Sequence, residues 1–107
     1  MRTEVTIISS VVFNSNANKY LNFPLRNSIR MSFWLDIRRG STFSEFHFDS
    51  IIEEINHEYF ARVLLPNTSM TLGLKVGDKF GFGARFACVG EGVVTGIVEQ
   101  GSQNFSN

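Results

Sequence analysis

The sequence predicts an all-β protein, folded as one small closed antiparallel β-barrel of six or seven strands. Eleven of its 107 residues are phenylalanine, and phenylalanine at this density, together with valine and isoleucine, favours strands. Every second residue from Ile29 to Ile37 is apolar, and the positions between them hold polar residues and Trp34, which is the period of a strand with one face on a core. No long segment shows the period of a helix. Many large rings in so short a chain indicate a barrel or sandwich whose interior they fill.

The first strand is expected over residues 3–13, where β-branched and aromatic side chains dominate. Residues 14–19 carry three asparagines and are expected to form a polar loop. Pro24 belongs in a loop or at a strand edge, because it has no amide proton to donate to a sheet. The alternating segment 29–37 then forms the second strand.

A turn at residues 38–41 leads into a strand over residues 43–49. Within it, Phe46 and Phe48 share one face, as the two-residue period of a strand requires. Three polar residues share the other face: Glu45, His47 and Asp49.

Residues 50–56 allow two interpretations. Ser50 followed by Glu53 matches a capping box, which predicts a helical turn, and the segment fits equally well as a continuation of the strand. Residues 58–66 return to a strand that ends at Pro66.

The last third of the chain is expected to form a loop at 67–70, a turn at 75–79 and two or three short strands over 80–98. Residues 101–107 are expected to be a flexible tail. The length suits a single domain over residues 1–107.

The charge balance disfavours two classes of partner. Lysine and arginine together number ten, as do aspartate and glutamate, so the formal net charge is zero. Non-specific binding to nucleic acid or to an anionic membrane needs a basic excess. A neutral chain also repels its own copies weakly, which favours a protein partner or a homo-oligomer. With neither a secretory leader nor an apolar run near the ~20 residues of a membrane span, a cytoplasmic location is expected.

Catalytic and metal-binding motifs are not evident. Cys88 is the single cysteine, which excludes an internal disulfide, and its apolar neighbours predict a small buried side chain. His47 and His57 have carboxylates nearby but lack the spacing of a metal site. The glycines do not form a phosphate loop, so no nucleotide, metal or other cofactor is expected. We therefore expect a protein that is not an enzyme; an enzyme would need one of the histidines to line a pocket.

The polar face of the 29–37 strand offers a candidate binding surface. Its alternation predicts an exposed row of four residues: Arg30, Trp34, Asp36 and Arg38. A tryptophan flanked by arginines has the composition of an interface hot spot. The same residues would also fit a tryptophan that covers the flank of the barrel with arginine stems packed over it.

The stretch "GARFACVGEGVVTGI", residues 83–97, resembles the end of the C-terminal β-barrel domain of elongation factor Tu and related translation GTPases. The similarity lies in Gly83, Arg85, Phe86 and Ala87, followed by the segment 92–97. Weaker similarities in the same order are "EVTII", "SIRMSFW" and "VLLP…VGD". The resemblance implies a small closed antiparallel barrel.

The departures from that family concern function. In the family, a longer loop between the last two strands contacts the T-stem of aminoacyl-tRNA. Here the corresponding turn is reduced to "CVGEG", which keeps Glu91 and Gly92 but has no arginine. Met31 stands where the family has a proline, and no GTPase domain is present in this sequence.

We therefore expect a stand-alone barrel that binds another protein as an adaptor or an immunity-type protein. The binding residues expected are Arg30, Trp34 and Arg38 on one wall and Glu91 at the shortened turn. The alternative is an RNA-binding module that contacts tRNA or rRNA, which the zero net charge disfavours.

Overall fold

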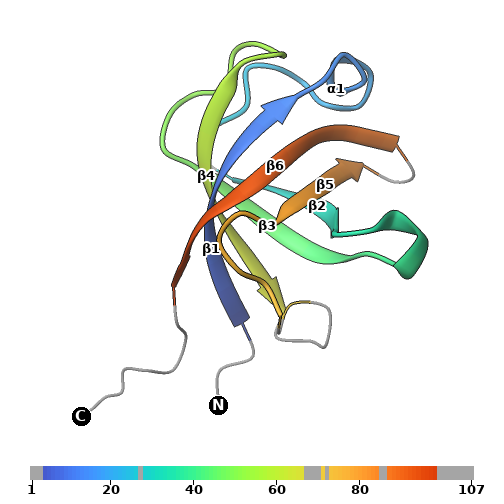
Figure 1. Ribbon diagram of the computed structural model, residues 1–107. Helices are drawn as coiled ribbons and strands as arrows, with labels where there is room; N and C mark the ends of the chain where they lie inside the picture. Colours follow the sequence, from blue (N-terminus) through green and yellow to red (C-terminus); the bar gives the residue numbers. More distant parts are fainter. Residues whose placement is uncertain (1–3, 27, 67–70, 72, 85–86, 99–107) are drawn as a thin grey trace.

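The structure, a computed structural model, describes residues 4–26, 28–66, 71, 73–84 and 87–98. Its six strands are β1 (Glu4–Phe13), β2 (Ser28–Trp34), β3 (Thr42–Phe48), β4 (Glu58–Pro66), β5 (Lys79–Ala84) and β6 (Ala87–Val98). They form a closed antiparallel barrel in the order β1-β4-β3-β2-β5-β6, and β6 pairs back onto β1 (Figure 1). The predicted all-β closed barrel is confirmed, with six strands.

Phenylalanine rings fill the barrel. Phe33 and Phe80 stack with ring centroids 4.7 Å apart, and Phe46 lies 4.8 Å from Phe82. Phe13 meets Phe82 edge to face at 5.3 Å. All five rings are at most 3% exposed. Two-residue alternation along each strand therefore places these rings inside the barrel and leaves the intervening residues on its outer wall.

Two glycines of β6 make room for these rings. Gly90 and Gly92 pair with Phe82 and Phe80 of β5. A Cβ atom at Gly90 would lie 2.7 Å from Cε1 of Phe82, and one at Gly92 would lie 2.8 Å from Cε1 of Phe80. Both distances are well inside van der Waals contact, so the rings can lie across this strand only because these residues have no side chain.

The predicted turn "CVGEG" is therefore wrong. Strand β6 continues through residues 88–92 with a register shift against β5 between Cys88 and Gly90, and Glu91 lies within the strand. The glycines that suggested a turn serve ring packing instead. The connection from β5 to β6 falls at residues 85–86, outside the described residues, as do the predicted loop at 67–70 and the predicted tail at 101–107.

Three further predictions need correction. Strand β2 ends at Trp34 rather than at residue 37, and the chain continues into a short 3-10 helix, η1 (Ile37–Arg39). The predicted loop at 14–19 contains one helical turn, α1 (Ala17–Tyr20). Residues 50–56 are neither helix nor strand: within them, Ile52 forms a single antiparallel bridge with Leu25.

Other predictions are confirmed. Strand β4 has the predicted bounds, and Phe46 and Phe48 lie on the opposite face of β3 from Glu45 and His47. Gly77 has a φ of 99° in the predicted turn after residue 74, a left-handed conformation that glycine adopts without a steric penalty. Among the described residues, no helix is long and apolar enough to cross a membrane.

Candidate functional site

The four predicted binding residues lie on the outside of the barrel but do not form one row. Arg30 and Trp34 project outward from β2, Arg38 lies on η1, and Glu91 projects outward from β6. The expected row fails beyond Trp34 because the chain leaves the strand there.

Asp36 accounts for this ending. Its Oδ1 accepts a hydrogen bond from the backbone N–H of Arg38 at 3.0 Å and another from Nε of Arg38 at 3.3 Å. The Arg38 side-chain and backbone hydrogen bonds, with the nearby charge of Arg39, lower the pKa of Asp36. A carboxylate that bonds the amide two residues ahead stabilises a turn in competition with a strand. We call residues 36–40 the arginine turn.

Trp34 covers the flank of the barrel. It pairs with Gly81 of β5, and a Cβ atom at Gly81 would lie 2.7 Å from Cε2 of the indole. A Cβ atom at Gly83 would lie 3.0 Å from the far end of the same ring. The indole therefore lies flat over two outward-facing glycines and is half-buried. This fits a tryptophan that covers the flank of the barrel, but the side chains of Arg30 and Arg38 are 89% and 87% exposed rather than packed over it.

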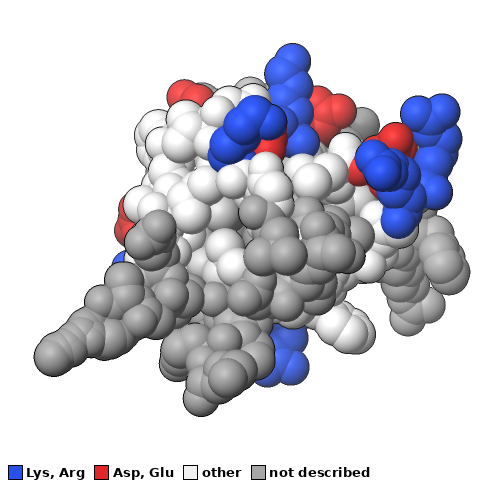
Figure 2. Space-filling view, turned by 60° about the horizontal axis from the view of Figure 1, so that its bottom comes forward, with Lys and Arg blue, Asp and Glu red and all other residues white. Residues whose placement is uncertain are grey.

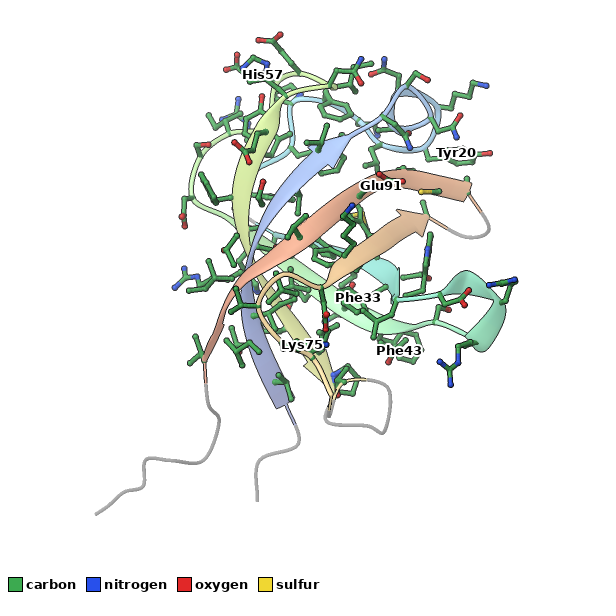
Figure 3. The ribbon with its side chains drawn as sticks, viewed as in Figure 1. Tyr20, Phe33, Phe43, His57, Lys75 and Glu91 are labelled. Atoms are coloured by element: carbon green, nitrogen blue, oxygen red, sulfur yellow. The ribbon has the colours of Figure 1, made fainter. Side chains whose placement is uncertain are left out.

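A mostly apolar groove opens on the neighbouring part of the wall, with a volume of about 620 Å³. It is lined by Leu64 and Pro66 of β4 and by Ala84 of β5. Phe43 of β3 also lines it, with 86% of its surface exposed. We call it the Phe43 groove. Figure 3 shows Phe43 projecting from β3 toward the end of the barrel opposite Tyr20.

One charged pair borders the Phe43 groove. Arg30 of β2 pairs in register with Glu45 of β3, and Nε of Arg30 lies 4.0 Å from Oε2 of Glu45. The Arg30 side chain is 89% exposed, so the guanidinium keeps donors free for a partner. Of the four predicted residues, Arg30 is the one that lines this groove.

A second groove, of about 530 Å³, crosses the wall between Trp34 and Glu58. Its floor is a row of outward-facing residues, each paired in register with the next: Glu58 of β4, Val12 of β1, Glu91 of β6, Gly81 of β5 and Trp34 of β2. Glu58 and Glu91 are exposed, and Lys79 also lines the groove. Because two carboxylates outnumber one ammonium group here, we call it the acidic groove.

The groups most suited to catalysis are the two histidines and the single cysteine, and Nε2 of His47 lies 3.4 Å from Oε1 of Glu45. Neither His47 nor His57 lines either groove. Cys88, predicted to be buried, is half-buried at the acidic groove, and its Sγ lies 3.4 Å from the carbonyl oxygen of Gly90. Within the described residues, no group of three or more histidine, cysteine or acidic side chains could hold a metal ion.

Sequence reasoning missed Phe43. The signal was present, because Phe43 shares the outward face of β3 with Glu45 and His47, two residues that were predicted to face away from the core. The exposed ring of Phe43 makes this face a candidate binding surface because it stands beside an apolar groove.

No protein-family model matches the sequence, and no curated protein does either.

Proposed function

We propose that this protein is a non-catalytic binding module and that the Phe43 groove is its main contact with another protein. The observation that carries the proposal is the exposed ring of Phe43 beside an apolar groove. An aromatic ring that a partner can enclose is typical of interface hot spots, because its burial removes a large apolar area from water.

The groove fits a partner with one apolar side chain and a nearby carboxylate. Leu64, Pro66 and Ala84 offer an apolar lining, and Arg30 at the border offers a bidentate donor to a carboxylate or a backbone carbonyl. We infer an adaptor or immunity-type role in the cytoplasm. The kinship with the C-terminal barrel of elongation factor Tu is proposed on the sequence similarities alone.

The test compares capture of host proteins by the tagged full chain with capture by two variants. Phe43→Thr removes the ring and introduces a β-branched residue suited to a strand. Tyr20→Thr is the matched control, because Tyr20 is a second exposed aromatic, 49% exposed, toward the other end of the barrel. We expect a partner bound by the wild type and by Tyr20→Thr, and at least about ten-fold less of it with Phe43→Thr, as for a hot-spot residue. Equal capture by all three proteins would refute the proposal.

A single-stranded RNA is the second candidate, favoured by one observation. Phe43 and Arg30 both line the groove, and an exposed ring with a nearby guanidinium is the combination on which bases stack. Glu45 beside Arg30 counts against it, and Figure 2 shows basic and acidic side chains mixed on the face it presents rather than a basic stripe. Tight RNA binding that weakens steeply with salt would favour this candidate.

A further inference from the structure

Carboxylates and uncharged residues follow one another along the floor of the acidic groove. From Glu58 to Trp34 the row crosses five strands, with Val12 between the two glutamates and Gly81 between Glu91 and Trp34. At about 4.8 Å per strand, Glu58 and Glu91 stand roughly 10 Å apart, on either side of Val12. Val12 is 38% exposed, so the acidic end of the groove has an apolar centre flanked by carboxylates.

The chain itself carries the complementary charge. The arginine turn has two arginines against the single carboxylate of Asp36. Arg38 is paired with Asp36, its Nε 3.3 Å from Oδ1, whereas Arg39 is exposed and makes no ion pair with any residue that the structure describes. The turn therefore carries an excess of one positive charge, and the acidic groove an excess of one negative charge.

The position of the turn relative to the groove suits a second copy of this chain. Trp34 is the last residue of the row and also the last residue of β2. The next residue, Leu35, also lines the groove and is 39% exposed. The arginine turn begins at the next residue. The row leaves β2 toward β5, whereas the turn leads from β2 to β3 on its other side, and Figure 1 shows the β2–β3 connection projecting from the barrel. A two-fold axis beside Leu35 would bring the turn of each copy toward the groove of the other, and such reciprocal contacts define an isologous interface.

We propose that the protein forms a symmetric dimer in which Arg39 of each copy binds between Glu58 and Glu91 of the other copy. Leu35 would meet its own counterpart near the axis and supply the apolar centre of the interface. This surface is distinct from the Phe43 groove. Failure of the dimer would therefore leave the proposed function intact, and failure of the proposed function would leave the dimer intact.

The test reverses the charge of the groove in one variant and of the turn in another, and measures dimerisation by sedimentation velocity at low and high salt. Glu91→Lys reverses the groove, and Arg39→Glu reverses the turn while leaving the Asp36–Arg38 pair in place. Two-fold symmetry repeats each contact, so each single variant is altered twice in its homodimer. We expect a wild-type dimer at low salt that is weakened by high salt, each variant alone dimerising at least about ten-fold more weakly, and an equimolar mixture of the two variants restoring the dimer.

The mixture also controls for folding, because only folded variants can restore each other. A wild type that stays monomeric at low salt up to millimolar concentration would overturn the proposal. So would a dimer that neither substitution weakens. Monomeric wild type that binds an oligoarginine peptide, with loss of that binding in Glu91→Lys, would also overturn it and would assign the groove to a different basic partner. Phe43→Thr serves as a further control and should dimerise like the wild type.

Discussion

Trp34 and Phe43 are both aromatic residues on the outer wall, on the adjacent strands β2 and β3, yet their surroundings differ. Trp34 has two glycines beneath it and is half-buried, whereas Phe43 pairs in register with Ser32 and is 86% exposed. Composition alone therefore does not separate a structural ring from a binding ring. What separates them is whether the neighbouring strand leaves room for the ring to lie flat.

Removing Trp34 should have the largest effect on stability. Trp34→Ala should lower the free energy of unfolding by about 2–3 kcal/mol, because it uncovers Gly81 and Gly83. The loss is smaller than for a fully buried tryptophan because Trp34 is only half-buried. Urea unfolding followed by far-UV circular dichroism measures this, since the variant has lost the single tryptophan. A loss below about 0.5 kcal/mol would show that Trp34 is not a structural cover.

The sequence predicted this wall only in part, for local reasons. The alternation of β2 was visible, but its end at Trp34 depends on Asp36 bonding the amide of Arg38, and such a bond competes with the strand without disturbing the pattern. Gly90 and Gly92 suggested a turn, since glycine is frequent both in turns and beneath rings. Only the register between β5 and β6 decides between these roles.

The candidate site was harder to predict than the fold. The row that floors the acidic groove draws on five strands, and closing the barrel brings β1 beside β6, so no short motif carries it. Glu91 was selected for a turn that does not exist, and it lies in the groove because it pairs with Val12 and Gly81.

A smaller effect should follow from filling the space under the indole. Gly81→Ala places a Cβ atom against Trp34 and should cost about 1–2 kcal/mol through overpacking. It should also shift the fluorescence of Trp34 to longer wavelength as the ring moves toward water.

Gly96→Ala is the matched control for that substitution. A Cβ atom at Gly96 would lie 3.6 Å from Cβ of Ile8, an ordinary contact, so stability should stay the same or rise by up to about 1 kcal/mol. Equal effects of the two substitutions would contradict the covering role of Trp34.

The smallest effect on stability is expected from Asp36, in the turn between β2 and β3. The pKa of Asp36 is lowered mainly by its side-chain hydrogen bond with Arg38. A lowered pKa means that the ionised turn is stabilised above the ordinary pKa of aspartate and that this contribution is lost as the pH falls through the lowered value. In an NMR titration, the Arg38 amide signal should move with a midpoint below the usual aspartate range, and Asp36→Asn should abolish that step. A midpoint at or above the usual range would contradict the hydrogen bonds described for the turn.

The most direct test of the comparison is the free energy of unfolding of Phe43→Thr, measured by urea unfolding beside the wild type. If Phe43 is a binding ring that the folded chain leaves in water, removing it should change the free energy of unfolding by no more than about 0.5 kcal/mol. The emission of Trp34 in the folded state should not change. A loss as large as that expected for Trp34→Ala would show that Phe43 is a structural ring and would contradict its assignment as the anchor of the binding surface.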